Sequence, residues 1–457
     1  MPYQAGGLPG TPPRRGAPRL RHRAPEPSPR TLTLNTYIRP VDRACRRRAF
    51  DASESGLFML LMPFGVLLLW FTGLLSLGLL GGGAYLIWAW YEGVVTGTGW
   101  LVAGVALVAL TFLGRPLVLL LVGRRPAPAE EEPAQARDGA FQVRRLPGAD
   151  GVQIQVEVYG RADGPTLVLT HGAGLNSTEW FYAKRHLADR FRLVVWDLPG
   201  LGRSTGPENN DFSLEKLAHD LEAVVRFARA DRPEPVLLLG HSIGGMILLT
   251  FCRLFPQHLG TVVAGLVLVH STYINPVRTT RGAGLLSALQ KPLLQPLLYL
   301  TIGLSPLVWL MNRLSYSSGL THLNAHWSHF AGQETKGQLD FTARFSLHAP
   351  PAVAARLMLA MLRYDATQTL GTIPVPVLVV VGDRDKMTLP GAGEHIRQAV
   401  PRGEIVCLAP AGHLGLVEQH EDWAHAVAPF AAACLVDAVA PPVASPDPPQ
   451  RAAAARP

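Results

Sequence analysis

The residues best suited to chemistry lie in three short motifs in the second half of the chain. Ser242 stands within Gly240-His241-Ser242-Ile243-Gly244, between the apolar run PVLLLG and an apolar helical pattern. Gly-x-Ser-x-Gly between a strand and a helix is typical of a tight, strained turn that exposes the Ser hydroxyl. The helix N-terminus beneath such a turn favours developing negative charge. This setting predicts Ser242 as a nucleophile, although the bare pattern also occurs in ordinary Gly-rich turns.

Two further motifs supply an acid and a base, in the chain order Ser, acid, His. Asp383 and Asp385 follow the run PVLVVVG, and His413 follows EIVCLAPAG. In a Ser–His–Asp set the imidazole accepts the Ser proton, and the carboxylate holds the imidazole in the required tautomer. Both Asp residues are candidates for that carboxylate.

The motifs are joined by alternating strand and helix patterns. Continuous apolar runs such as TLVLTHG and PVLVVVG suit strands that are buried on both faces of a parallel sheet. We expect strands at 152–159, 165–171, 191–197, 235–240, 263–270, 376–382 and 404–409, and helices at 213–229, 243–255 and 417–434. This alternation predicts an α/β domain over 141–436, with a doubly wound, mostly parallel sheet.

With these motifs in this order, residues 141–436 resemble the α/β-hydrolase superfamily, in its Ser-dependent esterase, lipase and haloperoxidase-like branch. The resemblance implies that Ser242 attacks an acyl carbonyl and that His413 accepts the Ser proton and later delivers it to the leaving group. It also implies that the acid is Asp385, the second Asp of a Gly-Asp-x-Asp motif. Asp383 is then a turn residue.

The resemblance implies an oxyanion hole as well. The segment HGAG at 171–174 follows a strand, as the family's oxyanion loop does. Backbone N–H groups need only a close approach, which small side chains permit. We therefore assign the oxyanion hole to the backbone amides of Ala173 and Ile243.

Other residues near these motifs are expected to be structural. They are His171, His241, which points away from the site in such turns, and the segment DLPGLGRS at 197–204. An Asp in place of Ser242 would have indicated an epoxide hydrolase or a dehalogenase. The four Cys have no metal-ligand spacing, and no phosphate-binding or dinucleotide motif occurs, so we predict no metal site and no cofactor.

Two long apolar runs precede this domain. No charged residue lies between Glu54 and Glu92, and a second, nearly uncharged run covers 93–122. About 20 apolar residues suffice to span a bilayer, and two such runs argue against both a soluble core helix and a cleaved signal peptide. We predict a transmembrane hairpin over 56–123. The first run is also long enough to tilt or to break at Gly81–Gly83, and a break would add a third crossing.

The net charge of +8 is concentrated at the N-terminus. Residues 1–50 hold eleven Arg against two acidic residues, so the remainder is close to neutral and no nucleic-acid-binding face is indicated. Arg-rich segments at 39–48 and 124–125 flank the apolar runs. By the positive-inside rule both ends of the hairpin are cytoplasmic. We thus expect an integral membrane protein (of the inner or plasma membrane, if bacterial) whose catalytic domain faces the cytoplasm.

Three segments are expected to lack regular structure because of their composition. Residues 1–55 are rich in Pro and Arg and should be disordered, 124–140 reads as a linker, and 437–457 is an Ala/Pro-rich tail that should also be disordered.

The α/β-hydrolase family places a lid or cap between the strand near 270 and the next helix, here about 271–352. Its segment 291–314 is strongly apolar and interrupted by Pro292, Pro296 and Pro306. A helical cap packed on the core accounts for it; alternatively, its apolar face touches a membrane or lines an acyl pocket. The tether and the charge-poor cap favour hydrolysis of carboxylic esters of lipids or other hydrophobic molecules.

These observations leave alternatives. An acyltransferase or a thioesterase would use the same acyl-enzyme, and a non-catalytic membrane receptor or scaffold could keep the fold. The expected partners are the lipid bilayer and a hydrophobic ester. The sequence does not indicate a protein partner.

Overall fold

The computed structural model describes residues 65–122, 133–134, 137, 139–280 and 282–437 of the 457-residue chain. The disorder expected for 1–55 lies outside these residues. The tail expected at 437–457 falls almost entirely outside them, and of the linker expected at 124–140 only residues 133–134, 137 and 139–140 are described. These three assignments stay predictions.

The α/β domain is built on one eight-stranded sheet with the strand order β1-β2-β4-β3-β5-β6-β7-β8. The strands are β1 (Gln142–Pro147), β2 (Gln153–Gly160), β3 (Thr166–Thr170), β4 (Arg192–Trp196), β5 (Val236–His241), β6 (Val263–Val269), β7 (Val377–Gly382) and β8 (Gly403–Leu408). β2 pairs antiparallel with β1 and β4, and every other pair is parallel. All seven predicted strands are found, and the structure has one further strand, β1, that the sequence did not predict. Four of the six residues of β1 (QVRRLP) are exposed and two are Arg, so no apolar run marks this edge strand.

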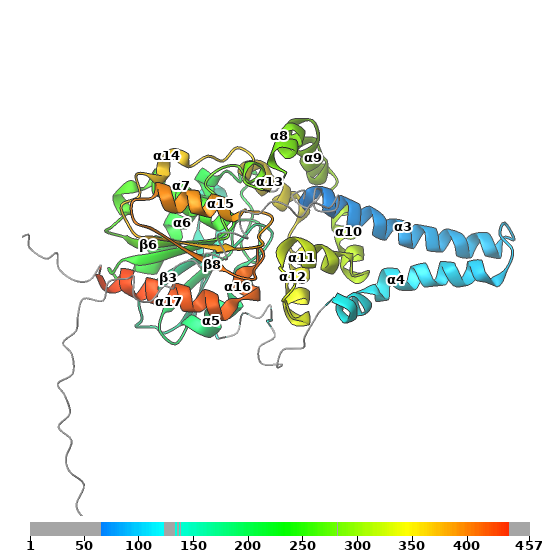
Figure 1. Cartoon of the computed structure of the whole chain (residues 1–457), viewed down its shortest axis with the longest axis horizontal. Coiled ribbons are helices and arrows are strands. Elements are labelled where there is room, and N and C mark those ends of the chain that lie inside the picture. Colours follow the sequence, from blue (N-terminus) through cyan, green and yellow to red (C-terminus); the bar gives the residue numbers. More distant parts are fainter. Residues whose placement is uncertain (1–64, 123–132, 135–136, 138, 281, 438–457) are drawn as a thin grey trace, which may run out of the picture. The chain divides into compact units, whose positions relative to one another are not determined.

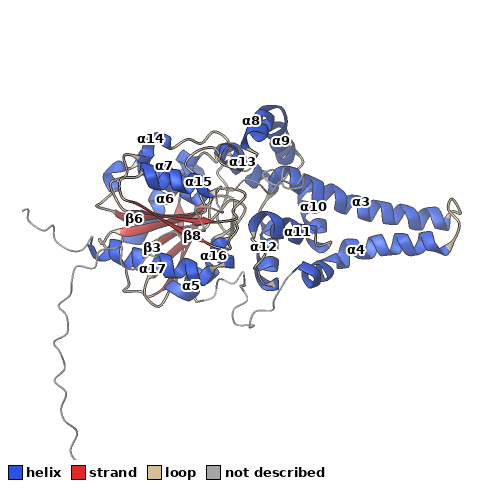
Figure 2. Ribbon diagram, viewed as in Figure 1, coloured by secondary structure: helices blue, strands red, loops and turns tan. Residues whose placement is uncertain are grey.

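Helices cover both faces of this sheet, with α5 and α17 on one face and α6, α7 and α15 on the other (Figure 2). The α-helices of the α/β domain outside the segment between β6 and β7 are α5 (Phe181–Leu187), α6 (Leu214–Arg229), α7 (Ile243–Leu254), α15 (Pro390–Ala399), α16 (Gly415–Glu418) and α17 (His420–Asp437), and the short α14 (Thr367–Leu370) precedes β7. The core consists of the buried apolar strands and the inward faces of these helices. Burial of both sheet faces explains why β3, β5, β6 and β7, which are buried throughout, are mostly apolar.

The register of the parallel strands aligns their carboxyl ends. Thr170 of β3 lies beside Gly240 of β5, and His241 lies beside Val269 of β6. The segments that follow β3, β5, β6, β7 and β8 therefore leave the sheet at one edge. In doubly wound sheets this edge is where binding sites form.

Two long apolar helices, α3 (Gly65–Tyr91) and α4 (Thr98–Val122), precede the sheet and lie side by side (Figure 1). Both are long and apolar enough to cross a membrane. α3 runs through the three glycines without a break. Gly83 is the point of closest approach to α4, since a Cβ there would lie 2.8 Å from the carbonyl oxygen of Gly104. Small residues at such a crossing let two apolar helices pack tightly.

The cap lies between β6 and β7, as the family resemblance implied. Its helices are α8 (Ala283–Leu289), α9 (Gln295–Gly303), α10 (Ser305–Ser317), α11 (Leu320–His329) and α12 (Lys336–His348), and α13 (Pro351–Met361) is the helix that follows the cap. The α8–α9 segment and α10 meet at an angle of 95°. α10 packs against both α3 and α4, and α11 and α12 pack against α4. The cap is thus joined to the apolar hairpin as well as to the α/β domain.

Candidate active site

Ser242 occupies a strained turn between β5 and α7. Its backbone has φ 53° and ψ −118°, a region that L-residues rarely adopt. Glycines make the turn possible, because a Cβ on Gly240 would lie 2.5 Å from the backbone of Gly244, and one on Gly244 would lie 2.3 Å from the carbonyl oxygen of Thr170. The turn is held in place by the N–H of Ser242, which donates to Val269 O at 2.9 Å.

Ser242, His413 and Asp385 form a continuous line of hydrogen bonds. His413 Nε2 lies 3.1 Å from Ser242 Oγ, and His413 Nδ1 lies 2.9 Å from Asp385 Oδ2. The ionised Asp385 accepts a hydrogen bond from the Nδ1–H group of His413, so the lone pair of Nε2 faces the Ser hydroxyl. The three residues that the sequence singled out, from loops after β5, β7 and β8, thus meet with the geometry that a nucleophile, a base and an orienting acid require.

The carboxylate of Asp385 is buried and fully hydrogen-bonded. Its Oδ1 accepts the N–H groups of Met387 and Thr388 at 2.8 and 3.0 Å, and its Oδ2 accepts the Thr388 hydroxyl at 2.7 Å. Burial alone would raise the pKa of Asp385, but the charges and hydrogen bonds of His413 and His270 hold that pKa well below its usual range. Asp385 is therefore ionised, as an acceptor from His413 must be.

Asp383 lies apart from His413. Its Oδ1 accepts the N–H of Ala411 at 2.9 Å and so ties the end of β7 to the loop that carries His413. The structure pairs His413 with Asp385, and the assignment of Asp385 as the catalytic acid stays a prediction.

Ile243 follows the nucleophile directly, at the first position of α7, and Ala173 lies in the loop after β3. Among the backbone hydrogen bonds between described residues, neither N–H donates to a protein acceptor, whereas the preceding amide of Gly172 donates to Glu179 Oε2 at 3.0 Å. Two unsatisfied donors beside a nucleophile are what an oxyanion hole presents before substrate binds.

A buried ion pair that the sequence did not indicate lies under this site. His241 Nδ1 is 2.5 Å from Glu179 Oε1, and His241 Nε2 is 3.1 Å from the carbonyl oxygen of His413. The carboxylate beside Nδ1 and the carbonyl beside Nε2 favour the doubly protonated, charged form of this ring. Burial by itself would lower the pKa of His241, but the charge and hydrogen bond of Glu179, together with the His413 carbonyl and the charge of Asp385, raise it. The pair links the oxyanion loop, through Gly172, to the backbone of His413.

The residues that were expected to be structural make structural contacts. His171 Nδ1 donates to Gly172 O at 2.8 Å, and its Nε2 accepts the N–H of Leu198 at 2.9 Å. Burial lowers the pKa of His171, which matches the neutral ring that these bonds require. In the segment 197–204, Asp197 accepts the N–H of Arg203 at 2.9 Å, and the segment forms a turn beside the oxyanion loop.

Two more histidines lie close to the pair formed by His413 and Asp385. His270, from the end of β6, has its Nδ1 3.4 Å from Asp385 Oδ2 and is fully buried; burial lowers its pKa to about 4. His329, from the end of α11 in the cap, has its ring centroid 6.4 Å from that of His413, and burial lowers its pKa to about 3. Glu418 holds the adjacent loops together by accepting the N–H groups of Ala331 and Gly412.

Sequence reasoning missed Glu179, His270, His329 and Glu418. Each is isolated in the sequence, outside any motif, and gains its partners only when distant loops meet. Within the described residues, no group of three or more His, Cys, Asp or Glu side chains is placed to hold a metal ion. A cavity of about 480 Å³ between α6, α7, α9 and α13 lies away from Ser242.

Comparison with known proteins assigns the fold to a family. The model of the alpha/beta hydrolase family matches residues 167–428, more than half of the chain. The chain therefore belongs to the alpha/beta hydrolase family. This match contains Ser242, Asp385 and His413.

Several curated relatives match shorter segments. The pimeloyl-[acyl-carrier protein] methyl ester esterase of Aeromonas salmonicida is 35% identical over 112 residues, which are 24% of this chain and 41% of that protein. Protein phosphatase methylesterase 1 of Mus musculus is 34% identical over 110 residues, 23% of this chain and 28% of that protein. The chain thus matches less than half the length of either relative.

Solved structures share the fold over a longer part of the chain. A thermophilic esterase from Thermogutta terrifontis covers 64% of this chain and 98% of its own, with a TM-score of 0.52 and 22% identity. A membrane phospholipase A, described as a bacterial virulence factor, covers 73% of this chain and 96% of its own, with a TM-score of 0.50 and 22% identity. At this level of identity the likeness establishes the fold alone.

Proposed function

We propose that this protein is a membrane-anchored serine hydrolase that cleaves carboxylic esters of lipids or other hydrophobic molecules through an acyl-enzyme on Ser242. The observation that carries the proposal is the line from Ser242 Oγ through His413 to Asp385, with contacts of 3.1 and 2.9 Å. The two curated relatives are both named as esterases, that is, as enzymes that cleave esters.

The reaction follows from these positions. Ser242 Oγ attacks the ester carbonyl while His413 Nε2 takes its proton, and Asp385 stabilises the resulting imidazolium. The carbonyl oxygen becomes an oxyanion that the N–H groups of Ala173 and Ile243 bind. When the C–O bond breaks, His413 returns the proton to the departing alcohol and Ser242 remains acylated. Water then attacks the acyl group in the same way and releases the acid.

Two features support a hydrophobic substrate at a membrane. The helices α3 and α4 have the length and composition of membrane-spanning segments. The cap exposes large apolar side chains, among them Leu300, Leu307 and Leu310. A monomeric soluble protein seldom exposes such groups together.

A fluorophosphonate probe tests the catalytic proposal directly. The folded full-length protein should be labelled, and Ser242→Ala should abolish the labelling while leaving the protein folded. No labelling of folded wild-type protein would refute a catalytic Ser242 and favour a non-catalytic receptor or scaffold. Hydrolysis of p-nitrophenyl esters and glycerolipids by wild type and by Ser242→Ala then defines the substrate class. Product analysis with added alcohols and thiols separates hydrolysis from acyl transfer.

The cytoplasmic orientation of the catalytic domain is proposed on the positive-inside rule. A reporter fused after residue 457 should be active as a cytoplasmic fusion. Activity of a reporter that functions only on the opposite side would overturn this orientation and leave the catalytic proposal intact.

A further inference from the structure

The spacing of tryptophans along α3 gives the depth of the hairpin in a bilayer, if the proposed membrane anchoring holds. Trp70 and Trp90 are twenty residues apart on one continuous helix, so their Cα atoms are separated by roughly 30 Å. This is about the thickness of the hydrocarbon layer. Tryptophan prefers the two membrane–water interfaces. Trp90, near the α3–α4 connection, marks the far interface, and Trp70 marks the interface on the side of the α/β domain.

The contacts between the cap and the hairpin begin at the interface marked by Trp70 and continue toward the centre of the bilayer. Trp70 Nε1 donates to Thr301 of α9 at 2.9 Å. Six residues further along α3, the hydroxyl of Ser76 lies 3.3 and 3.1 Å from those of Ser315 and Ser318, at the end of α10. Six helical residues span about 9 Å, so the contacts between the cap and α3 continue into the hydrocarbon layer.

The second helix of the hairpin holds the cap at the same depth. A Cβ on Gly114 of α4 would lie 2.4 Å from the carbonyl oxygen of Ser318, so these backbones are in direct contact. Arg115 forms two hydrogen bonds of 2.8 Å to the carboxylate of Asp340. The polar groups along this contact therefore have protein partners, as polar groups in hydrocarbon must.

The outward side of the same cap helices is apolar and uncovered. α9, α10 and the residue between them expose large apolar side chains to 39–46% of their surface: Leu300, Leu304, Leu307, Trp309 and Leu310. The guanidinium of Arg313 lies 3.7 Å from the centre of the Trp309 ring. An Arg that rests on an aromatic ring can keep its charge at the interface while the ring faces acyl chains.

We propose that the outward faces of α9 and α10 are immersed in the acyl-chain region of the leaflet next to the α/β domain. The hairpin and the cap then form one membrane-inserted unit, and the partner of the exposed cap face is lipid. The register set by Trp70 and the polar contacts between cap and hairpin favour lipid over a second copy of the chain. α11 runs from this inserted unit to His329, whose ring lies beside that of His413.

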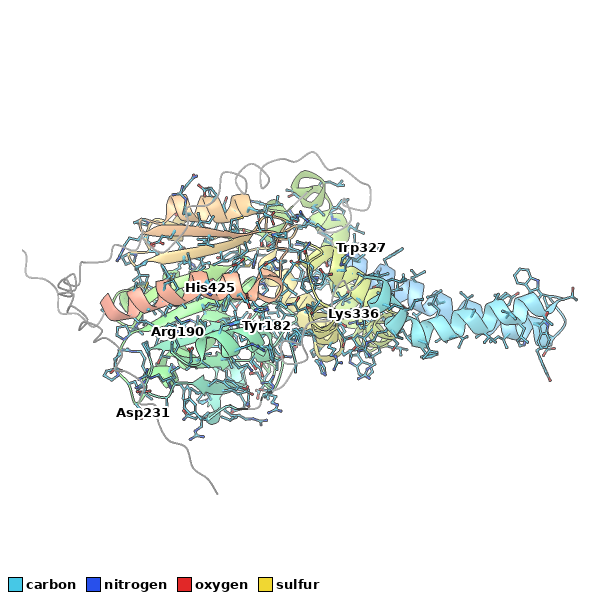
Figure 3. All side chains as sticks on the ribbon, turned by 60° about the horizontal axis from the view of Figure 1, so that its bottom comes forward. Tyr182, Arg190, Asp231, Trp327, Lys336 and His425 are labelled. Atoms are coloured by element: carbon cyan, nitrogen blue, oxygen red, sulfur yellow. The ribbon has the colours of Figure 1, made fainter. Side chains whose placement is uncertain are left out.

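Depth-dependent quenching tests the proposal on the full-length protein in phosphatidylcholine vesicles. A fluorescent non-canonical amino acid is placed singly at Leu307 or Leu310 in the cap, at Leu110 in α4, or at Asp231. Asp231, in the loop before β5, lies at the opposite end of the α/β domain from the hairpin (Figure 3). Each variant must retain fluorophosphonate labelling, which shows that the domain is folded. Spin-labelled lipids carry the quencher in their acyl chains.

The expected result is quenching at Leu307 and Leu310 within about twofold of that at Leu110, with none at Asp231. Quenching at Leu110 while both cap positions behave like Asp231 would overturn cap immersion and leave membrane anchoring intact. An unquenched Leu110 would overturn the anchoring as well. If a second copy covers the cap, the fluorescence at Leu307 will change as the protein is diluted with excess lipid and will resist the spin label, which also overturns the proposal.

Discussion

The substitution Asp385→Asn removes the negative charge that orients His413 while preserving the shape of the side chain. Asp385 now accepts four donors: two backbone N–H groups on Oδ1, and the Thr388 hydroxyl and His413 Nδ1 on Oδ2. An amide offers only one oxygen. If that oxygen takes the place of Oδ2, the new NH₂ group takes the place of Oδ1 and faces the N–H groups of Met387 and Thr388. The NH₂ group and both N–H groups are then donors without acceptors. Each buried polar group left unpaired costs about 1–3 kcal/mol.

The amide should therefore turn the other way, with its NH₂ toward His413. The Thr388 hydroxyl can rotate to accept, and His413 can accept through Nδ1. His413 then carries its proton on Nε2, facing Ser242, and cannot act as a base. Stability should change little, but kcat should fall about 10⁴-fold, the loss seen when this carboxylate is neutralised in Ser–His–Asp enzymes. That factor corresponds to about 5 kcal/mol of activation free energy.

Steady-state hydrolysis of a p-nitrophenyl ester measures this loss, and thermal unfolding of the same preparations measures stability. Asp383→Asn is the matched control: its amide oxygen can still accept the N–H of Ala411, so activity should fall less than tenfold. A larger loss for Asp383→Asn than for Asp385→Asn would refute the assignment of the acid. Equal losses that accompany equal falls in Tm would show that both residues act only through folding.

Three further perturbations test other parts of the structure. His270 is neutral in the folded protein because burial lowers its pKa from 6.5 to about 4. As the pH falls, the unfolded chain binds this proton first, so up to about 3 kcal/mol of stability is lost between pH 6.5 and 4. His270→Gln removes the titrating group and should flatten the fall of Tm with pH in this range. Glu179→Gln breaks a fully buried ion pair and should lower the free energy of unfolding by about 3 kcal/mol. Denaturant unfolding at pH 7 measures this free energy. A value for the variant within about 0.5 kcal/mol of wild type, which is the usual effect of a neutral surface substitution, would contradict the prediction. Gly114→Leu places a Cβ against a cap carbonyl and should lower the Tm in detergent, whereas Gly78→Leu, where nothing lies within 4 Å, should not; equal Tm values would mean that cap and hairpin are not packed as described.

Much of the fold was predictable because local sequence patterns indicate most of its strands and helices. Buried parallel strands appear as uninterrupted apolar runs, so seven strands could be placed within one or two residues. The edge strand β1 could not, because four of its six residues face solvent and its sequence carries two Arg. The three glycines of α3 suggested a possible break. The structure instead uses Gly83 for helix packing, and that use depends on Gly104, twenty-one residues away.

The candidate site divides in the same way. The sequence by itself determined Ser242, His413 and the pair of Asp residues, since a strained turn and strand-end loops leave motifs that can be read along the chain. The choice of Asp385 rested on family resemblance, and the hydrogen bond to His413 gives it a geometric basis. Only the tertiary structure decided that a buried Glu179 charges the histidine next to the nucleophile, and that the cap is fastened to the hairpin by Arg115. These contacts join residues far apart in the chain, and a buried charge leaves no local pattern because its stability depends entirely on the partner that folding brings to it.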